Sequence, residues 1–139
     1  MEFFIHKEFI GLNDYTEKNR THKYAGSTAK KRETNDVAMM LMHKPKVEQY
    51  PVKIEFIWLI NNRAKDLDNV TFAKKYILDG MVKARILKSD NLTKIIAFED
   101  KAIIVKKKHH QGVLVRITEN YEVKEQEHYA KKMEEFGRL

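Results

Sequence analysis

The stretch YPVKIEFIWLI, residues Tyr50 to Ile60, alternates apolar with polar side chains in its first half and is wholly apolar in its second half. Alternation with a period of two is typical of a strand with one buried face. A strand that becomes apolar on both faces is typical of the middle of a sheet. The stretch therefore predicts a central strand whose far end is buried on both sides.

Helical periodicity predicts a helix on either side of this strand. The first helix spans Ala29 to Lys44 and ends before Pro45, because proline disfavours helical geometry in the preceding residue. The second helix spans about Asn69 to Ile86. We expect the buried stripes to contain Thr34, Val37, Ala38, Leu41 and Met42 in the first helix, and Val70, Ala73, Ile77, Met81 and Ala84 in the second. The cluster of Met39, Met40 and Met42 suits core or dimer packing better than a binding surface.

The rest of the chain adds short strands and a last helix. Phe3 to Ile10 is predicted as a first strand, and Asn13 to His22 as a loop or short helix. Three short strands are expected at Lys94 to Phe98, Ala102 to Lys106 and Gly112 to Thr118, followed by a helix from Glu122 to Phe136 with Ala130, Met133 and Phe136 on its apolar side. The prediction is one α+β domain, residues 1–139, with a mixed sheet, flanking helices and a hairpin-rich second half.

Composition favours a polyanionic partner. The 139 residues contain 27 Lys and Arg against 20 Asp and Glu, a formal charge of +7, and the sequence pI is about 9.5. Such a surplus favours nucleic acid, although many small proteins are basic without binding it. The absence of cysteine excludes disulfides, thiolate zinc sites and cysteine nucleophiles. No signal peptide or membrane-spanning stretch is recognised, so we expect a soluble, cytoplasmic protein.

Two acids follow the central strand. Asp66 and Asp68 are separated by one residue, which in extended backbone places their side chains on the same side, with Cα atoms about 6 to 7 Å apart. A divalent ion such as Mg²⁺ would relieve their repulsion and accept their oxygens. Alternatively, Asp68 or Asn69 caps the next helix and Asp66 is a solvated loop residue. An EF-hand is excluded, because its sixth position would be Thr71 instead of glycine.

A third acid and two lysines complete the candidate site. Asp90 follows the second helix, which returns the chain across the sheet, so Asp90 could meet the first two acids; alternatively, Ser89-Asp90-Asn91 is a turn. Three carboxylates without His or Cys at ligand spacing suit Mg²⁺ or Mn²⁺. Lys74 or Lys75 could neutralise charge at a phosphate. Alternatively, Lys75 pairs with Asp79 on the helix surface.

Three basic clusters could follow a DNA backbone, which gives salt-dependent affinity with little sequence information. Lys106 to His110 could equally be a solvated turn, and its two histidines are poor candidates for metal ligands because adjacent strand residues point apart. The segment from Glu119 to Leu139 is more acidic, and we expect it to face away from DNA or to pack in a dimer. The predicted DNA-binding residues are Arg20, Lys23, Lys30, Lys31 and Arg32; Arg63 and Lys65, with Lys74; and Lys106, Lys107 and Lys108.

The combined pattern resembles the RusA family, endodeoxyribonucleases common in prophages. The resemblance rests on DLDN at 66–69, a helix with Lys75 and Asp79 four apart, Asp90, and VLVRITE at 113–119. It implies a Mg²⁺-dependent homodimer that nicks four-way (Holliday) DNA junctions symmetrically, with Asp66, Asp68 and Asp90 as metal-binding catalytic acids and Lys75 as catalytic lysine. About three extra residues lie between Asn69 and Lys75 compared with the family's best-known form, which leaves Lys74 as an alternative lysine.

Two other functions fit the same residues. A DNA-binding protein without catalysis would use the basic clusters and treat the acids as caps and turns. A metal-dependent nuclease for other branched DNA would keep the same site and differ only in the shape of its substrate. A phage- or prophage-encoded protein in a bacterial cytoplasm is what the family resemblance implies.

Overall fold

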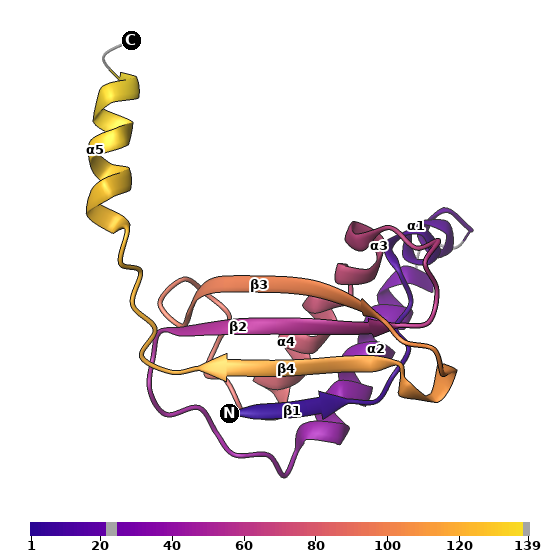
Figure 1. The fold of residues 1–139 in the computed structure, drawn as a ribbon. Coiled ribbons are helices and arrows are strands. Elements are labelled where there is room, and N and C mark those ends of the chain that lie inside the picture. Colours follow the sequence, from indigo (N-terminus) through magenta and orange to yellow (C-terminus); the bar gives the residue numbers. More distant parts are fainter. Residues whose placement is uncertain (22–24, 138–139) are drawn as a thin grey trace.

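A computed structural model describes residues 1–21 and 25–137 and shows an α+β domain built on one four-stranded mixed sheet (Figure 1). The strands are β1 (Glu2–Ile5), β2 (Val52–Ile60), β3 (Ile95–Ile104) and β4 (Gly112–Thr118), in the order β1-β4-β2-β3. β2 pairs in parallel with β3, and β4 pairs antiparallel with both β1 and β2. The predicted mixed sheet in a single domain is therefore confirmed.

β2 is the central strand that its sequence predicts. Val52, Ile54, Phe56 and Trp58 are at most 1% exposed and form one row of the hydrophobic core. On the opposite face Ile57 is also buried, whereas the last two residues of the strand are only half-buried. Burial on both faces is therefore confirmed from Phe56 to Trp58, whereas the prediction that the far end of the strand is buried on both sides is wrong for Leu59 and Ile60.

Helices cover one face of the sheet, with α2 and α4 against it and no helix over the opposite face in Figure 1. Val37 and Leu41 of α2 pack with Ile77 and Met81 of α4 in the core beneath β2. These side chains belong to the stripes predicted from helical spacing. The helices are α1 (Leu12–Thr21), α2 (Ala25–Leu41), α3 (Leu67–Thr71) and α4 (Lys74–Lys83).

Several predicted boundaries are wrong. β1 ends at Ile5, so the predicted first strand is half as long, and α2 begins four residues earlier than predicted. The single helix expected from Asn69 to Ile86 is divided into α3 and α4. Val70, Thr71 and Phe72, at the break, are β-branched or aromatic and have low helix propensity.

The expected hairpins of the second half are also wrong. β3 is one continuous strand through Glu99-Asp100-Lys101, which the sequence predicts to be a break between two strands. Charged residues are tolerated there because β3 is an edge strand with much of its surface in water. β4 does not pair with β3; the chain passes through a short 3₁₀ helix, Lys108–His110, and inserts β4 between β1 and β2.

Apolar side chains expected to be packed are exposed in two places. Met39, Met40 and Met42 are 72%, 46% and 61% exposed, so the core-packing prediction for them is wrong, while dimer packing stays a prediction. The last helix, α5 (Gln126–Gly137), begins four residues later than expected, stands apart from the sheet in Figure 1 and has no buried residue. No helix in the described part of the chain is long and apolar enough to cross a membrane.

A buried acid fixes the connection after β1. Glu33 on α2 is 3% exposed, and its Oε1 lies 3.3 Å from Lys7 Nζ, which also lies 3.0 Å from Asp36 Oδ2. Burial, and secondarily the charge of Glu33, raises the pKa of Tyr76 to about 12, so this phenol stays neutral in the core. The Lys7 ion pairs hold residues 6–11 against the helical layer.

The close contact between α2 and α4 gives a stability prediction. A Cβ on Gly80 would lie 2.5 Å from Val37 Cγ1 and 3.2 Å from the Thr34 carbonyl oxygen. Alanine normally stabilises a helix by about 1 kcal/mol relative to glycine, but Val37 is fully buried and stiff at χ1. We therefore expect Gly80→Ala to lower the free energy of unfolding by about 1 to 3 kcal/mol in urea titrations.

Two variants test this explanation. Gly137→Ala, where an added Cβ meets no atom within 4 Å, should leave stability almost unchanged. Val37→Ala should restore part of the loss when it is combined with Gly80→Ala, because it removes the clashing methyl groups. A Gly80→Ala protein more stable than the original chain would contradict the close contact.

Candidate active site

The candidate site lies at one edge of the sheet. β1, β2 and β3 run in the same direction and β4 runs opposite, so the carboxyl ends of three strands meet where β4 begins. The connections 6–11, 61–66 and 105–111 leave the sheet at this edge, on the right of Figure 1. In open α/β sheets, ligands bind preferentially outside the carboxyl ends of strands.

Asp66 and Asp68 lie at the beginning of α3, on this edge. Asp66 occupies the N-cap position, with φ −80° and ψ 145°, and its side chain makes no capping hydrogen bond. Asp68 lies in the first turn, and its Oδ1 accepts a 2.9 Å hydrogen bond from the Asn69 backbone N–H. The extended pair that we expected is wrong, because Asp68 is helical. Both carboxylates are exposed. Asp66 stands at the N-cap position, but its side chain does not cap the helix.

Asn69 connects these acids to the start of α1. Its Oδ1 accepts a 3.0 Å hydrogen bond from the backbone N–H of Asn13. Gly11 makes this approach possible, since a Cβ there would lie only 2.7 Å from Asn69 Oδ1. The Asn69 side chain therefore joins α3 to the start of α1. It does not cap α3, which was one of the alternatives predicted from the sequence.

Asp90 is brought to Lys75. The chain returns along α4, and Lys75 Nζ lies 3.0 Å from Asp79 Oδ1 and 3.1 Å from Asp90 Oδ2. These hydrogen bonds, with Asp79 the larger cause and Asp90 the second, raise the pKa of Lys75 above its ordinary value. Lys75 is therefore a half-exposed ammonium group that stays charged and is flanked by two carboxylates.

The three predicted acids do not form one cluster in the described structure. Within residues 1–21 and 25–137, no three Asp, Glu, His or Cys side chains lie close enough together to hold one metal ion. The exposed oxygens of Asp66 and Asp68 fit the donor chemistry of a hard divalent cation. Asp90 instead pairs with Lys75, whose Nζ lies 3.1 Å from Asp90 Oδ2.

Lys74 has a different environment from Lys75. Its Nζ lies 2.6 Å from Asp100 Oδ2 on β3 and 4.7 Å from the centre of the Phe98 ring. Asp100 Oδ1 also accepts a 2.9 Å hydrogen bond from Trp58 Nε1. Lys74 is only 21% exposed, so the structure places it in a packed ion pair and not on an open DNA-binding surface. Sequence analysis missed Asp100, which is 26 residues from Lys74 with no helical or strand spacing between them.

Two residues overlooked in the sequence fasten a basic loop to this edge. The Asn61 side-chain amide donates hydrogen bonds to the carbonyl oxygens of Val105, at 2.7 Å, and Lys106, at 2.9 Å. The Asn61 backbone N–H donates to Gln111 Oε1 at 3.2 Å. The loop with Lys106, Lys107 and Lys108 is therefore attached to the segment that contains Arg63 and Lys65. The only sequence signal was a polar residue directly after a strand.

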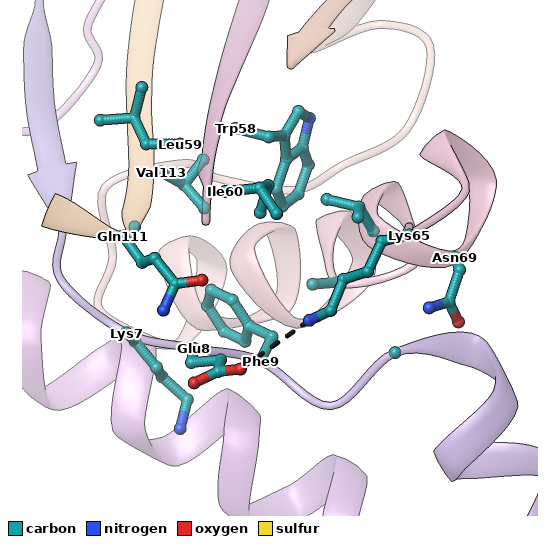
Figure 2. A pocket seen from close by; sticks show the side chains of 14 residues that line it. Lys7, Glu8, Phe9, Trp58, Leu59, Ile60, Lys65, Asn69, Gln111 and Val113 are labelled. Atoms are coloured by element: carbon teal, nitrogen blue, oxygen red, sulfur yellow. Dashed lines mark ion pairs between the residues drawn. The ribbon is translucent and has the colours of Figure 1, made fainter. Parts of the chain in front are cut away.

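Figure 2 shows a pocket whose lining includes Lys65 and Asn69. Trp58, Ile60 and Ala73 contribute its apolar wall, and Lys7, Gln111 and Asn69 are among its polar lining residues. Lys65 also lines it, with Nζ 3.8 Å from Glu8 Oε1, as the dashed line in Figure 2 shows. Because Lys65 and Asn69 flank the two acids in the chain, the pocket is adjacent to the candidate site.

The remaining basic cluster lies on the helices. Arg20 on α1 and Lys30, Lys31 and Arg32 on α2 are exposed, whereas Lys23 lies outside the described residues. Lys30 and Lys31 line a shallow hollow together with Asp79 and Lys83 of α4. This basic surface therefore adjoins the partner of Lys75, whereas the other two clusters lie at the sheet edge.

Comparison with known proteins adds no assignment. No protein-family model matches the sequence, and no curated protein matches it.

Because Lys74 and Lys75 have different environments, we expect their replacement to lower the free energy of unfolding by different amounts. Lys74→Met leaves Asp100, 22% exposed, without its cation, and we expect a loss of about 1 to 3 kcal/mol in the free energy of unfolding. Lys75→Met removes two exposed ion pairs and should cost at most about 1 kcal/mol. Urea unfolding of both variants measures the difference, and equal losses would show that Lys74 is not a packing residue.

Proposed function

We propose that this chain is a Mg²⁺-dependent, structure-selective endodeoxyribonuclease that resolves four-way DNA junctions by paired symmetric nicks. The observation that carries the proposal is the position of Asp66 and Asp68. Their exposed carboxylates lie at the same sheet edge as the basic loop that Asn61 holds. A site for phosphodiester hydrolysis needs both features, since acids hold the cation and lysines hold the DNA backbone.

The basic residues support binding of a DNA backbone. Arg63, Lys65 and the loop Lys106–Lys108 are exposed at the edge. They hold positive charge on both sides of the acids along the chain, and this charge would place a phosphate next to the carboxylates. Contacts of this kind fix the position of DNA without reading its sequence, which agrees with selectivity for branched shape.

The acids and Lys75 have separate roles in the proposal. Asp66 and Asp68 would hold Mg²⁺, or Mn²⁺ in its place, through oxygen donors. When bound, such an ion supplies positive charge that stabilises the attacking and leaving oxygens of a phosphodiester. Lys75 would add a fixed charge close to the scissile phosphate. Asp90 takes part by orienting the Lys75 ammonium, which it contacts at 3.1 Å.

A homodimer belongs to the same proposal. A four-way junction presents two equivalent strands, and a two-fold dimer presents two equivalent sites. Each subunit would cut one strand, which explains why paired nicks and not a single nick are expected.

One observation favours a second candidate, a junction- or duplex-binding protein without catalysis. Asp90 is hydrogen-bonded to Lys75, and aspartates in the first turn of a helix are favourable for ordinary electrostatic reasons. In that case the acids are structural, and the basic edge alone accounts for function.

A cleavage assay separates these functions. A labelled synthetic four-way junction and a linear duplex of the same arms are incubated with Mg²⁺, and we expect paired nicks in the junction only. Asp68→Asn should reduce the cleavage rate by about 100-fold or more, because it removes an oxygen donor from the proposed metal site. The matched control is Asp14→Asn, an exposed aspartate in the first turn of α1.

Each alternative has its own result. Tight binding without cleavage in Mg²⁺ and Mn²⁺ would establish the binding protein, whereas cleavage of flaps in preference to junctions would establish a different branched-DNA nuclease. A rise in melting temperature with Mg²⁺ that disappears in Asp66→Asn would support metal binding independently of activity. An Asp68→Asn protein that cleaves at the original rate would contradict the proposed site.

The basic loop gives a prediction about salt. Replacing Lys106, Lys107 and Lys108 with alanine should reduce the slope of log affinity against log salt concentration by about 2 to 3, close to one ion per phosphate contact. Replacing the exposed helical Lys30 and Lys31 with alanine is the comparison variant. If only the Lys30 and Lys31 variant changes the slope, the DNA binds to the helical face and not to the sheet edge.

A further inference from the structure

β3 presents a long free edge. It is ten residues long, and β2 is its only partner strand in the described part of the chain. The backbone N–H of Val105 donates to the Ile60 carbonyl oxygen at 2.9 Å, so the backbone groups of Val105 point toward β2. Since backbone groups alternate in direction along a strand, those of Phe98, Asp100, Ala102 and Ile104 point away from β2. They form a ladder ready for another strand.

The free edge is apolar at both ends. Ile96, Phe98, Ile103 and Ile104 are between 38% and 46% exposed. Long, apolar edge strands readily pair with another chain, and proteins usually shorten or cover them. The exposed edge of β3 is therefore a candidate for pairing with another strand.

The sequence of β3 is complementary to its own reverse. The strand reads IIAFEDKAII from Ile95 to Ile104. Counted outward from Asp100, the first pair is Glu99 and Lys101, of opposite charge. The next two pairs, Phe98 with Ala102 and Ala97 with Ile103, each combine a large side chain with a small one, and Ile96 with Ile104 combines two isoleucines.

We propose that β3 pairs antiparallel with β3 of a second copy of this chain, about a two-fold axis at Asp100. Glu99 then lies opposite the partner's Lys101, and Phe98 lies opposite the partner's Ala102. Opposite residues share a face of the sheet, so each of these pairs is a side-chain contact. The two sheets join into one of eight strands, and the helices of both copies lie on the same face.

Charge selects this register. A shift that centres the axis on Glu99 would place two glutamates opposite each other, and one that centres it on Lys101 would oppose two lysines; like charges in these positions are destabilising. Asp100 is the one residue of β3 that lies opposite the same residue of the second copy. Its charge is already compensated by Lys74 and by the hydrogen bond from Trp58. Lys101 forms no ion pair within residues 1–21 and 25–137, which leaves it available for the partner's Glu99, although Glu99 also lies 3.0 Å from Lys53 Nζ of its own chain.

The proposal is independent of nuclease activity, because it rests only on the edge of β3. The same charges have an opposite interpretation, in which Glu99 and Lys101 protect the edge and keep the chain monomeric. Measurement of the molar mass in solution distinguishes the two.

The first experiment uses charge reversal and sedimentation equilibrium. We expect the original chain to be a dimer and Glu99→Lys and Lys101→Glu each to be weakened at least 10-fold in self-association. Mixing the two variants should restore dimers, because the first has two lysines and the second two glutamates at the facing positions. Lys44→Glu, at an exposed lysine in the turn after α2 and outside β3, is the matched control.

Every result of this experiment decides the proposal. A monomeric original chain would overturn it, and so would a dimer that both reversals leave intact. Restored association in the mixture supports it even if one variant alone is less stable, since complementarity is then the only property that the mixture gains.

The second experiment tests register through disulfide formation in a chain that contains no cysteine. Ala97 lies opposite the partner's Ile103 at a non-hydrogen-bonded pair, where opposite Cα atoms are about 4.5 Å apart. Mixing Ala97→Cys with Ile103→Cys under mild oxidation should give a cross-linked pair, whereas neither variant should cross-link to itself. Self-linking of either variant, or linking of Lys44→Cys to the same extent, would exclude the register.

Discussion

The parallel pairing of β2 with β3 is the constraint on which the candidate site depends. It brings the ends of both strands to one edge of the sheet, so the segment with Asp66 and the loop with Lys106 leave the sheet at the same edge although 40 positions separate them in the chain. An antiparallel β3 would have sent the basic loop to the opposite edge. The hydrogen bonds of Asn61 then fix the loop in this place.

The sequence predicted what depends on local periodicity. The alternation in β2 and the stripes that contain Val37 and Ile77 identified part of the core, because burial in strands and helices repeats with a fixed period. The stripes also included Met42, which is exposed, and omitted Tyr76 and Ile86, which are buried. Strand order could not be predicted, since it depends on which edges meet. The division of β3 was predicted wrongly for the same reason, because Glu99-Asp100-Lys101 is polar in sequence yet continuous in an edge strand.

The two lysines show why spacing predicts a site only in part. Lys74 and Lys75 are adjacent, and no pattern in the chain distinguishes them. The helix turns about 100° between them, which directs Lys74 to Asp100 and the aromatic rings of β3 and directs Lys75 to Asp79 and Asp90. Both lysines are paired with carboxylates, but the Lys74 side chain is 21% exposed and that of Lys75 is 52% exposed. Lys75 is therefore the more accessible of the two for the role that we propose.

If the proposed β3–β3 dimer also cleaves four-way junctions, the symmetry of the dimer has to match that of the DNA. In a β3 pair the two-fold axis is perpendicular to the joined sheet, so the carboxyl edges of the two copies point in opposite directions. Each β3 ends four residues beyond Asp100, about 13 Å along the strand, which puts the two acid sites on opposite sides of the axis. A four-way junction has two-fold symmetry of its own, and opposed strands are the ones that symmetric nicking requires. Paired cleavage by this dimer therefore needs the axis of the junction to coincide with the axis through Asp100, with the DNA crossing the joined sheet from one basic edge to the other.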